Sequence, residues 1–80
     1  MTRRRLHLTF PERLIQEPVV HTLGTRFGIV TNIRRANVEE RFGWIILEVD
    51  GTEDALSEGI DYLRELGVQV DQIEGDVVQG

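Results

Sequence analysis

The stretch FGIVTNIRRANVEERFGWIILEVDG, residues Phe27 to Gly51, decides the fold because it has the pattern of two β-strands joined by a charged hairpin. Its second half, Trp44 to Val49, is rich in β-branched and aromatic residues and ends at the turn signal Asp50-Gly51. In its first half the alternation expected of a strand with one buried face fails, because Arg34 and Arg35 stand side by side. This irregularity predicts a β-bulge in the first strand of the hairpin.

The flanking segments predict one strand and one helix on each side of this hairpin. Before it, Leu6–Phe10 alternates as a strand and Glu17-Pro18 opens an amphipathic helix. After it, Thr52 caps a second helix that ends at Gly67, and the last strand covers Val68–Ile73. The order predicts an α+β, ferredoxin-like βαββαβ two-layer sandwich, with a four-stranded antiparallel sheet and two helices on one face. The first and third strands would be central, and the second would be an edge strand.

The length of 80 residues predicts one domain, with a core over residues 4–74 and a tail over 75–80. A chain of this size buries only about 60% of its unfolded surface, so its stability is marginal. It has no cysteine, which excludes disulfides, thiolate catalysis and cysteine-based metal sites. Association of two copies is the remaining way to add stability, and we expect a homodimer.

The predicted faces of the second hairpin strand point to the same conclusion. If Ile45, Leu47 and Val49 face the helices, then Trp44 and Ile46 face outward and are exposed in a free monomer. Contiguous exposed apolar surface is typical of an interface, so we expect these two residues at a dimer interface. The alternatives are a register that differs by one residue, or a tail that folds over them.

Charge is distributed unevenly along the chain. Residues 1–43 carry eight arginines and four acids, whereas residues 44–80 carry one arginine and ten acids, for a net charge of -5. The acidic total argues against nucleic-acid binding. The arginine-rich half could bind an anion or an acidic partner, and the alternative is that Arg3 to Arg5 form a solvated N-terminal tail. No targeting signal or membrane-span pattern is present, so a cytoplasmic location without membrane association is expected.

The side chains of this chain argue against catalysis. His7 and His21 have no metal-ligand spacing, and no nucleophile elbow, phosphate loop or dinucleotide fingerprint occurs. We therefore expect no enzyme activity, cofactor or metal. Asn32 offers an amide donor and acceptor on an edge strand, which suits the carboxylate and ammonium of a free amino acid. The alternative is that Asn32 bonds the backbone at the bulge.

A series of short segments, in order and spacing, resembles the NIL domain family from about Arg4 to Val70. These segments are Leu8-Thr9-Phe10, Glu17-Pro18-Val19, Phe27-Gly28-Ile29-Val30, Asn32-Ile33, Ala36-Asn37-Val38 and Gly43-Trp44. Asn32-Ile33-Arg34 stands at the Asn-Ile-Leu-type motif that names the family, with an arginine in place of leucine.

The resemblance implies an ACT-related, ferredoxin-like domain of the kind found at the C-terminus of methionine importer ATPases, where it binds methionine near a dimer interface and inhibits transport. Such domains also precede ferredoxin modules. We therefore expect a homodimeric regulatory domain that senses an amino acid, methionine first. The alternative is an adaptor whose arginine-bearing hairpin docks an acidic partner such as a ferredoxin. The expected ligand-binding residues are Phe27, Ile29, Asn32, Ile33 and Arg34, and the expected interface residues are Trp44 and Ile46.

Overall fold

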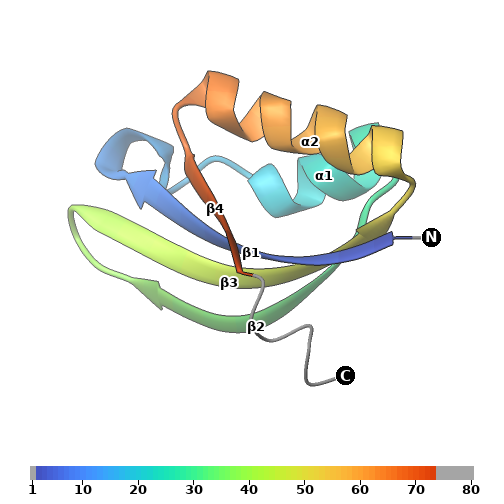
Figure 1. The fold of residues 1–80 in the computed structure, drawn as a ribbon. Coiled ribbons are helices and arrows are strands. Elements are labelled where there is room, and N and C mark those ends of the chain that lie inside the picture. Colours follow the sequence, from blue (N-terminus) through green and yellow to red (C-terminus); the bar gives the residue numbers. More distant parts are fainter. Residues whose placement is uncertain (1, 74–80) are drawn as a thin grey trace.

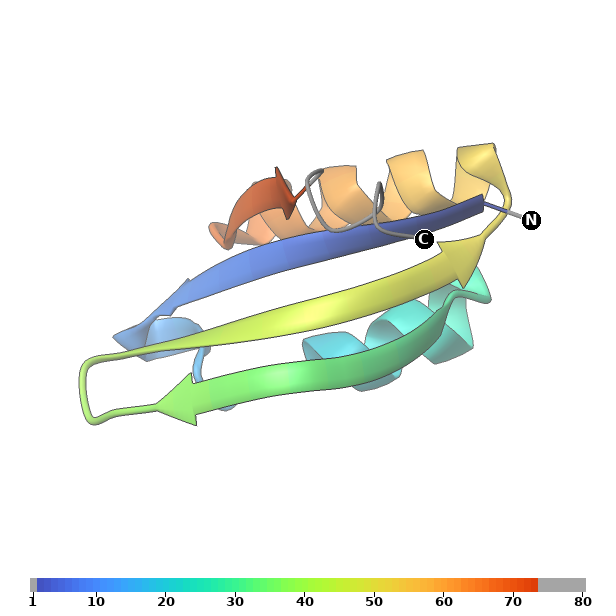
Figure 2. The ribbon, with the colours of Figure 1, turned by 60° about the horizontal axis from the view of Figure 1, so that its bottom comes forward.

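The computed structural model describes residues 2–73 of the chain, and these form the predicted ferredoxin-like sandwich. In chain order its elements are β1 (Thr2–Pro11), a short 3-10 helix (Glu12–Leu14), α1 (Val19–Phe27), β2 (Val30–Val38), β3 (Phe42–Gly51), α2 (Glu53–Leu66) and β4 (Gln69–Ile73). The strands pair antiparallel in the order β2-β3-β1-β4, and both helices cover one face (Figures 1 and 2). β1 and β3 are central and β2 is an edge strand, as predicted. The expected tail lies outside the described residues.

The helix ends follow from local chemistry. The Thr52 hydroxyl accepts a hydrogen bond from the Ala55 N–H at 3.0 Å, so Thr52 is the N-cap of α2 as predicted. Gly28 and Gly67 end the two helices in the left-handed region, with φ of 69° and 108°. Pro18 was expected at the first helical position of α1. In the structure it is the N-cap, and the helix begins at Val19. Among residues 2–73, neither helix has the length and apolar character required to cross a membrane.

The core lies between the helices and the central strands. Its fully buried side chains alternate along β1 and β3 and recur at helical spacing on α1 and α2; they include Leu6, Leu8, Leu47, Val49, Leu23, Leu56 and Leu63. Because Leu47 and Val49 point to the helices, the predicted faces of β3 are confirmed. Trp44 and Ile46 occupy the open face, where they are half-buried rather than exposed. Trp44 stacks on His7 of β1, with 5.6 Å between the ring centroids.

The structure corrects the interpretation of Arg3 to Arg5 as a solvated tail. All three lie in β1, which starts at Thr2, and each pairs with an acid more than 40 residues away in the sequence. The pairs are Arg3–Asp50 at 3.0 Å, Arg4–Glu53 at 3.0 Å and Arg5–Glu48 at 2.9 Å. The strand pattern began at Leu6 because the arginines conceal the alternation, yet β1 continues opposite β3 as far as Gly51. Part of the charge asymmetry is therefore neutralised within the domain.

Candidate functional site

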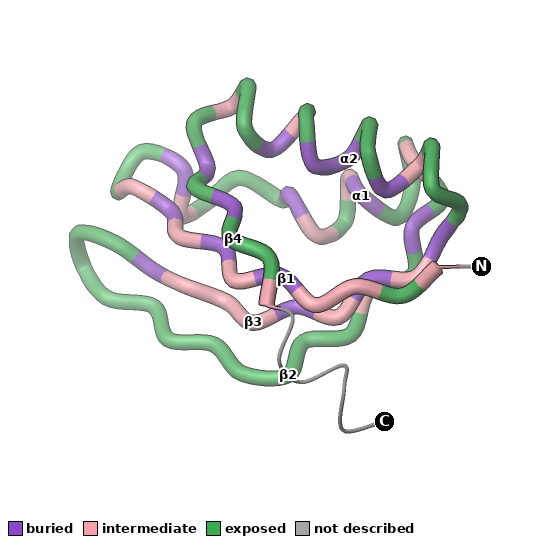
Figure 3. The backbone as a smooth tube through the Cα atoms, viewed as in Figure 1, coloured by how far each residue is buried: buried purple, intermediate pink, exposed green. Residues whose placement is uncertain are grey.

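Strand β2 leaves most of its length uncovered. Eight of its nine residues are exposed and one is half-buried (Figure 3). The nine residues of α1 span only about 14 Å at 1.5 Å per residue, whereas the nine residues of β2 span about 30 Å. One helix of this length cannot cover the strand, so β2 presents both an unpaired edge and exposed side chains.

The predicted bulge in β2 is confirmed. Ile33 pairs with Leu47 and Arg35 pairs with the adjacent Ile46, so Arg34 is the extra residue. The insertion places Ile33 on the helix-covered face and Arg35 on the open face, although they are two residues apart. A bulge also interrupts the regular row of hydrogen-bonding groups along the strand edge, so the backbone in the middle of β2 differs from that of a regular strand.

The predicted ligand-binding residues fall into two groups. Asn32, Ile33 and Arg34 lie together on the exposed part of β2, and Ile33 is 52% exposed. Phe27 instead packs on Tyr62, with 5.4 Å between ring centroids, and Ile29 is a core residue at 4% exposure. Ile29 therefore offers no surface to a ligand in this conformation.

Asn32 is the polar group of this edge. Its side chain makes no hydrogen bond within the described residues, so it does not bond the backbone at the bulge. It lies opposite Glu48, which accepts a hydrogen bond from the Arg5 guanidinium at 2.9 Å. That hydrogen bond lowers the pKa of Glu48 below its ordinary value. Partial burial acts in the opposite direction, and the charges of Arg3 and Arg34 lower the pKa further. Asn32 thus borders a carboxylate held in its ionised form.

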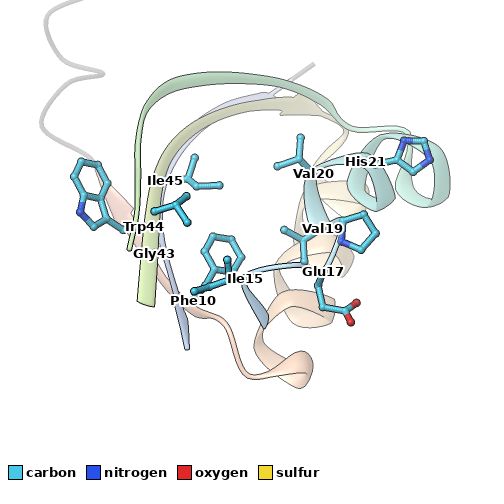
Figure 4. Close-up of a pocket in the computed structure, with 11 residues that line it drawn as sticks. Phe10, Ile15, Glu17, Val19, Val20, His21, Gly43, Trp44 and Ile45 are labelled. Carbon is cyan, nitrogen blue, oxygen red and sulfur yellow. The ribbon is translucent and has the colours of Figure 1, made fainter. Parts of the chain in front are cut away.

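A cavity of about 150 Å³ lies elsewhere, between the start of α1 and the far end of the β2–β3 hairpin (Figure 4). Its apolar lining comes from Phe10, Ile15, Val19, Val20, Val38 and Ile45. Glu17, His21 and Trp44 also border it, but Figure 4 shows their side chains directed away from the hollow. Sequence patterns did not predict this cavity. Its one signal was Gly43, a glycine inside an otherwise bulky strand.

Metal-ligating side chains are dispersed in the described part of the chain: no three histidine or acidic groups of residues 2–73 gather closely enough to hold an ion. Two features of the described residues are considered as binding sites, the polar edge around Asn32 and the apolar cavity beside Gly43. Both are suited to binding.

Two curated proteins are similar to this chain in sequence. Over 70 residues it is 29% identical to "Methionine import ATP-binding protein MetN" of Coxiella burnetii, which covers 82% of this chain and 20% of that protein. Over 71 residues it is 28% identical to "L-aspartate semialdehyde sulfurtransferase iron-sulfur subunit" of Methanocaldococcus jannaschii, covering 89% of this chain and 53% of that protein. The chain thus spans a fifth of the first relative and about half of the second.

Structure comparison and a family model agree with this similarity. The C-terminal domain of an ABC transporter ATP-binding protein from Enterococcus faecalis superposes with a TM-score of 0.77 at 18% identity, covering 90% of this chain and 84% of that one. The model of the NIL domain family matches residues 4–72, which is nearly the whole described structure. The chain therefore belongs to the NIL domain family.

Proposed function

We propose that this chain is a non-enzymatic regulatory module that binds and senses a free amino acid, methionine first, at the edge of β2. The observation that carries the proposal is the Asn32 amide, exposed and without a hydrogen-bond partner among the described residues, on an unpaired strand edge. The name of the Coxiella burnetii relative links a protein with a segment similar to this chain to methionine import, which makes methionine the first ligand to test.

The chemistry of the edge suits an amino acid. The Asn32 carbonyl can accept a hydrogen bond from an ammonium group, and its NH₂ can donate to a carboxylate. The neighbouring Ile33 offers half-exposed apolar surface, and Arg34 at the bulge adds a positive charge for the carboxylate. Because Asn32 and Ile33 point to opposite faces of the sheet, a ligand that touches both must lie across the edge.

A ligand that lies across the edge stays largely open to solvent on one chain, and a second copy would enclose it. This is the role that we propose for a homodimer, with Trp44 and Ile46 of the open face at its interface. Sedimentation velocity tests the assembly: the wild-type chain should sediment as a dimer and Ile46→Glu as a monomer. A wild-type chain that stays monomeric at all concentrations would contradict it.

Calorimetric titration with the free amino acids tests the ligand. We expect heat with methionine, and a loss of about tenfold or more in affinity for Asn32→Ala, since an unpaired polar group costs about 1–3 kcal/mol. Asn37→Ala is the matched control, because Asn37 is also an exposed β2 amide and donates to Glu39 at 3.3 Å. Absence of heat with every amino acid would end this proposal.

A second candidate function is an adaptor for an acidic protein such as a ferredoxin. Arg34 and Arg35 form no salt bridge among residues 2–73, whereas Arg3 and Arg4 do. The iron-sulfur subunit among the relatives makes a ferredoxin a suitable first probe. Capture of a purified ferredoxin should weaken steeply with salt and with Arg34→Ala/Arg35→Ala, but not with Arg3→Ala. Salt-independent capture would count against this role.

A further inference from the structure

The apolar cavity beside Gly43 arises from two features of the chain. Gly43 pairs with Phe10 on one side and Val38 on the other, so a side chain at this position would face the helices. Glycine leaves out this side chain, whose Cβ would lie beside Val38, 3.7 Å from its Cγ2. In addition, α1 begins only at Val19, and the hairpin extends beyond its first turn (Figure 1). The hollow is therefore bounded by the sheet and the start of the helix, and it is open on one side.

The walls of this cavity select an apolar occupant. Figure 4 shows Phe10, Ile15, Val19, Val20 and Ile45 around the hollow. The carboxylate of Glu17 and the ring of His21 point elsewhere, so no charged side chain lines the interior. A polar group that packs against these side chains would find no hydrogen-bond partner among them, so the walls favour an apolar group.

The size of the cavity limits the occupant to one small group. A volume of about 150 Å³ is the size of an engineered protein cavity, lined by leucine, isoleucine and phenylalanine, that stays dry and binds benzene. We propose that this cavity is a binding site for one uncharged apolar group of benzene size, such as an aromatic ring or a branched aliphatic end of a small molecule.

The location gives such a ligand a mechanical effect. It would contact α1 through Val19 and Val20 and the hairpin through Val38 and Ile45. Val38 is 65% exposed, so an occupant would also cover apolar surface that water now reaches. Binding would thus fix the far end of the hairpin against the helix.

This site is separate from the amino-acid site proposed at Asn32. Asn32 faces the open side of the sheet opposite Glu48, whereas the cavity lies on the helix-covered side. Six residues along β2 separate Asn32 from Val38, which corresponds to about 20 Å. Neither site needs the other, so each can fail alone.

Amide chemical-shift titration of the full chain with benzene tests the proposal. Glycerol, which also has six heavy atoms, is the polar control. We expect saturable shifts centred on Val19, Val20, Gly43 and Ile45 with benzene, a higher melting temperature, and neither change with glycerol. Shifts that do not saturate, or that centre on other residues, would overturn the site.

Variants that fill the cavity test its location. Gly43→Ala and Gly43→Val add carbon atoms from the strand; a Cβ at this position meets its nearest neighbour, the Asn37 carbonyl oxygen, at 3.4 Å. Val20→Phe fills the hollow from the helix instead. The two filled variants change different elements, so the site is still tested if one of them does not fold. Gly43→Val and Val20→Phe should abolish the saturable benzene shifts, and His21→Ala should leave them unchanged. Retention of benzene binding in both filled variants would overturn the proposal.

Two further measurements separate the sites and the occupants. Asn32→Ala should lose its methionine heat and keep its benzene shifts, whereas Gly43→Val should do the reverse. Simultaneous loss of both responses in folded Gly43→Val would overturn the separate site. Without benzene, dilution should leave the Val19 and Val20 amide shifts unchanged, even where dissociation of the proposed dimer shifts those of Trp44 and Ile46. Concentration-dependent shifts at Val19 and Val20 would assign the cavity to a side chain from a second copy.

Discussion

Strands β1 and β2 pair with the two sides of β3, yet β1 is a central strand of the sheet and β2 is an edge strand. β1 pairs with β3 in continuous register from Thr2–Gly51 to Pro11–Phe42, and its inward side chains are buried. β2 pairs with the other side of β3 through a register shift at Arg34, and its side chains are almost all exposed. The same central strand thus has one neighbour inside the molecule and one on its surface.

This difference in burial indicates that β1 contributes mainly to stability and that β2 is available for binding. β1 carries the alternating apolar residues and lies between two other strands, so its substitution removes buried surface. β2 contributes hydrogen bonds to β3 but little buried side-chain area, and so its side chains are available for recognition. Substitutions of the exposed β2 side chains are therefore expected to cost the fold little.

The largest expected effect contrasts two residues that face each other across β2 and β3. Leu47→Ala removes a fully buried side chain and should lower the free energy of unfolding by about 2–5 kcal/mol. Ile33→Ala, directly opposite but 52% exposed, should cost about 1 kcal/mol or less. Urea denaturation followed by circular dichroism measures both. Equal losses would mean that β2 is covered in solution.

The next effect concerns the residue that anchors the start of β2. A Cβ at Gly59 of α2 would approach Ile29 Cδ1 to 2.6 Å and Leu23 Cδ2 to 3.2 Å. Overpacking costs about 1–3 kcal/mol, which exceeds the helix-propensity gain of up to about 1 kcal/mol, so Gly59→Ala should be destabilising.

Gly24→Ala is the matched control for Gly59→Ala. Gly24 also lies in a helix, but its nearest contact for an added Cβ is the Ile29 carbonyl oxygen at 3.6 Å, an ordinary distance. This variant should gain about 0.4–1 kcal/mol. Thermal denaturation of the two variants compares them, and a stabilised Gly59→Ala would show that Ile29 is not held firmly at the helix interface.

Sequence patterns predicted the order of elements, the central strands and the bulge because each has a local cause. Because Arg34 and Arg35 stand side by side, an extra residue lets both Ile33 and Ala36 lie opposite helix-facing residues of β3. Thr52 and the acids after it identify a helix start without reference to the rest of the chain. These features depend on neighbours in sequence, and one chain displays them directly.

Features that depend on distant pairing were harder to predict. Arg3 to Arg5 belong to β1 because Asp50, Glu48 and Glu53 lie beside them in space, and spacing along the chain does not display that proximity. Ile29 carries no mark that distinguishes a core side chain from a ligand contact. The cavity beside Gly43 is lined by residues of β1, α1, β2 and β3, whose relative positions only the fold determines.

Removing the bulge should change stability less than the glycine substitutions do, and it should mainly change self-association. Deleting Arg34 leaves Ile33 and Arg35 opposite Leu47 and Ile46 in regular register, so the fold should lose no more than about 1 kcal/mol. A regular, uninterrupted edge pairs more readily with another strand. Sedimentation should therefore show larger assemblies for the deletion than for Arg34→Ala, which keeps the bulge. An unchanged distribution would mean that the bulge does not protect the edge.

The smallest expected effect is the dependence of stability on pH through the Arg5–Glu48 pair. The Arg5 guanidinium donates to Glu48 and lowers the pKa of this carboxyl below its ordinary value of 4.5 in the folded state. The stabilisation from this pair is therefore complete above pH about 4.5 and is lost as the pH falls through the lowered pKa.

Glu48→Gln should thus be less stable than the wild type at pH 7 and lose less stability on acidification, so that the two unfolding midpoints approach each other below pH about 4.5. Glu58→Gln, on α2 and outside the salt bridges among residues 2–73, should follow the wild type throughout. Urea midpoints between pH 7 and pH 3 measure the difference. Parallel curves for wild type and Glu48→Gln would contradict a stabilising role of the Arg5–Glu48 ion pair and would mean that backbone and apolar contacts hold β1 against β3.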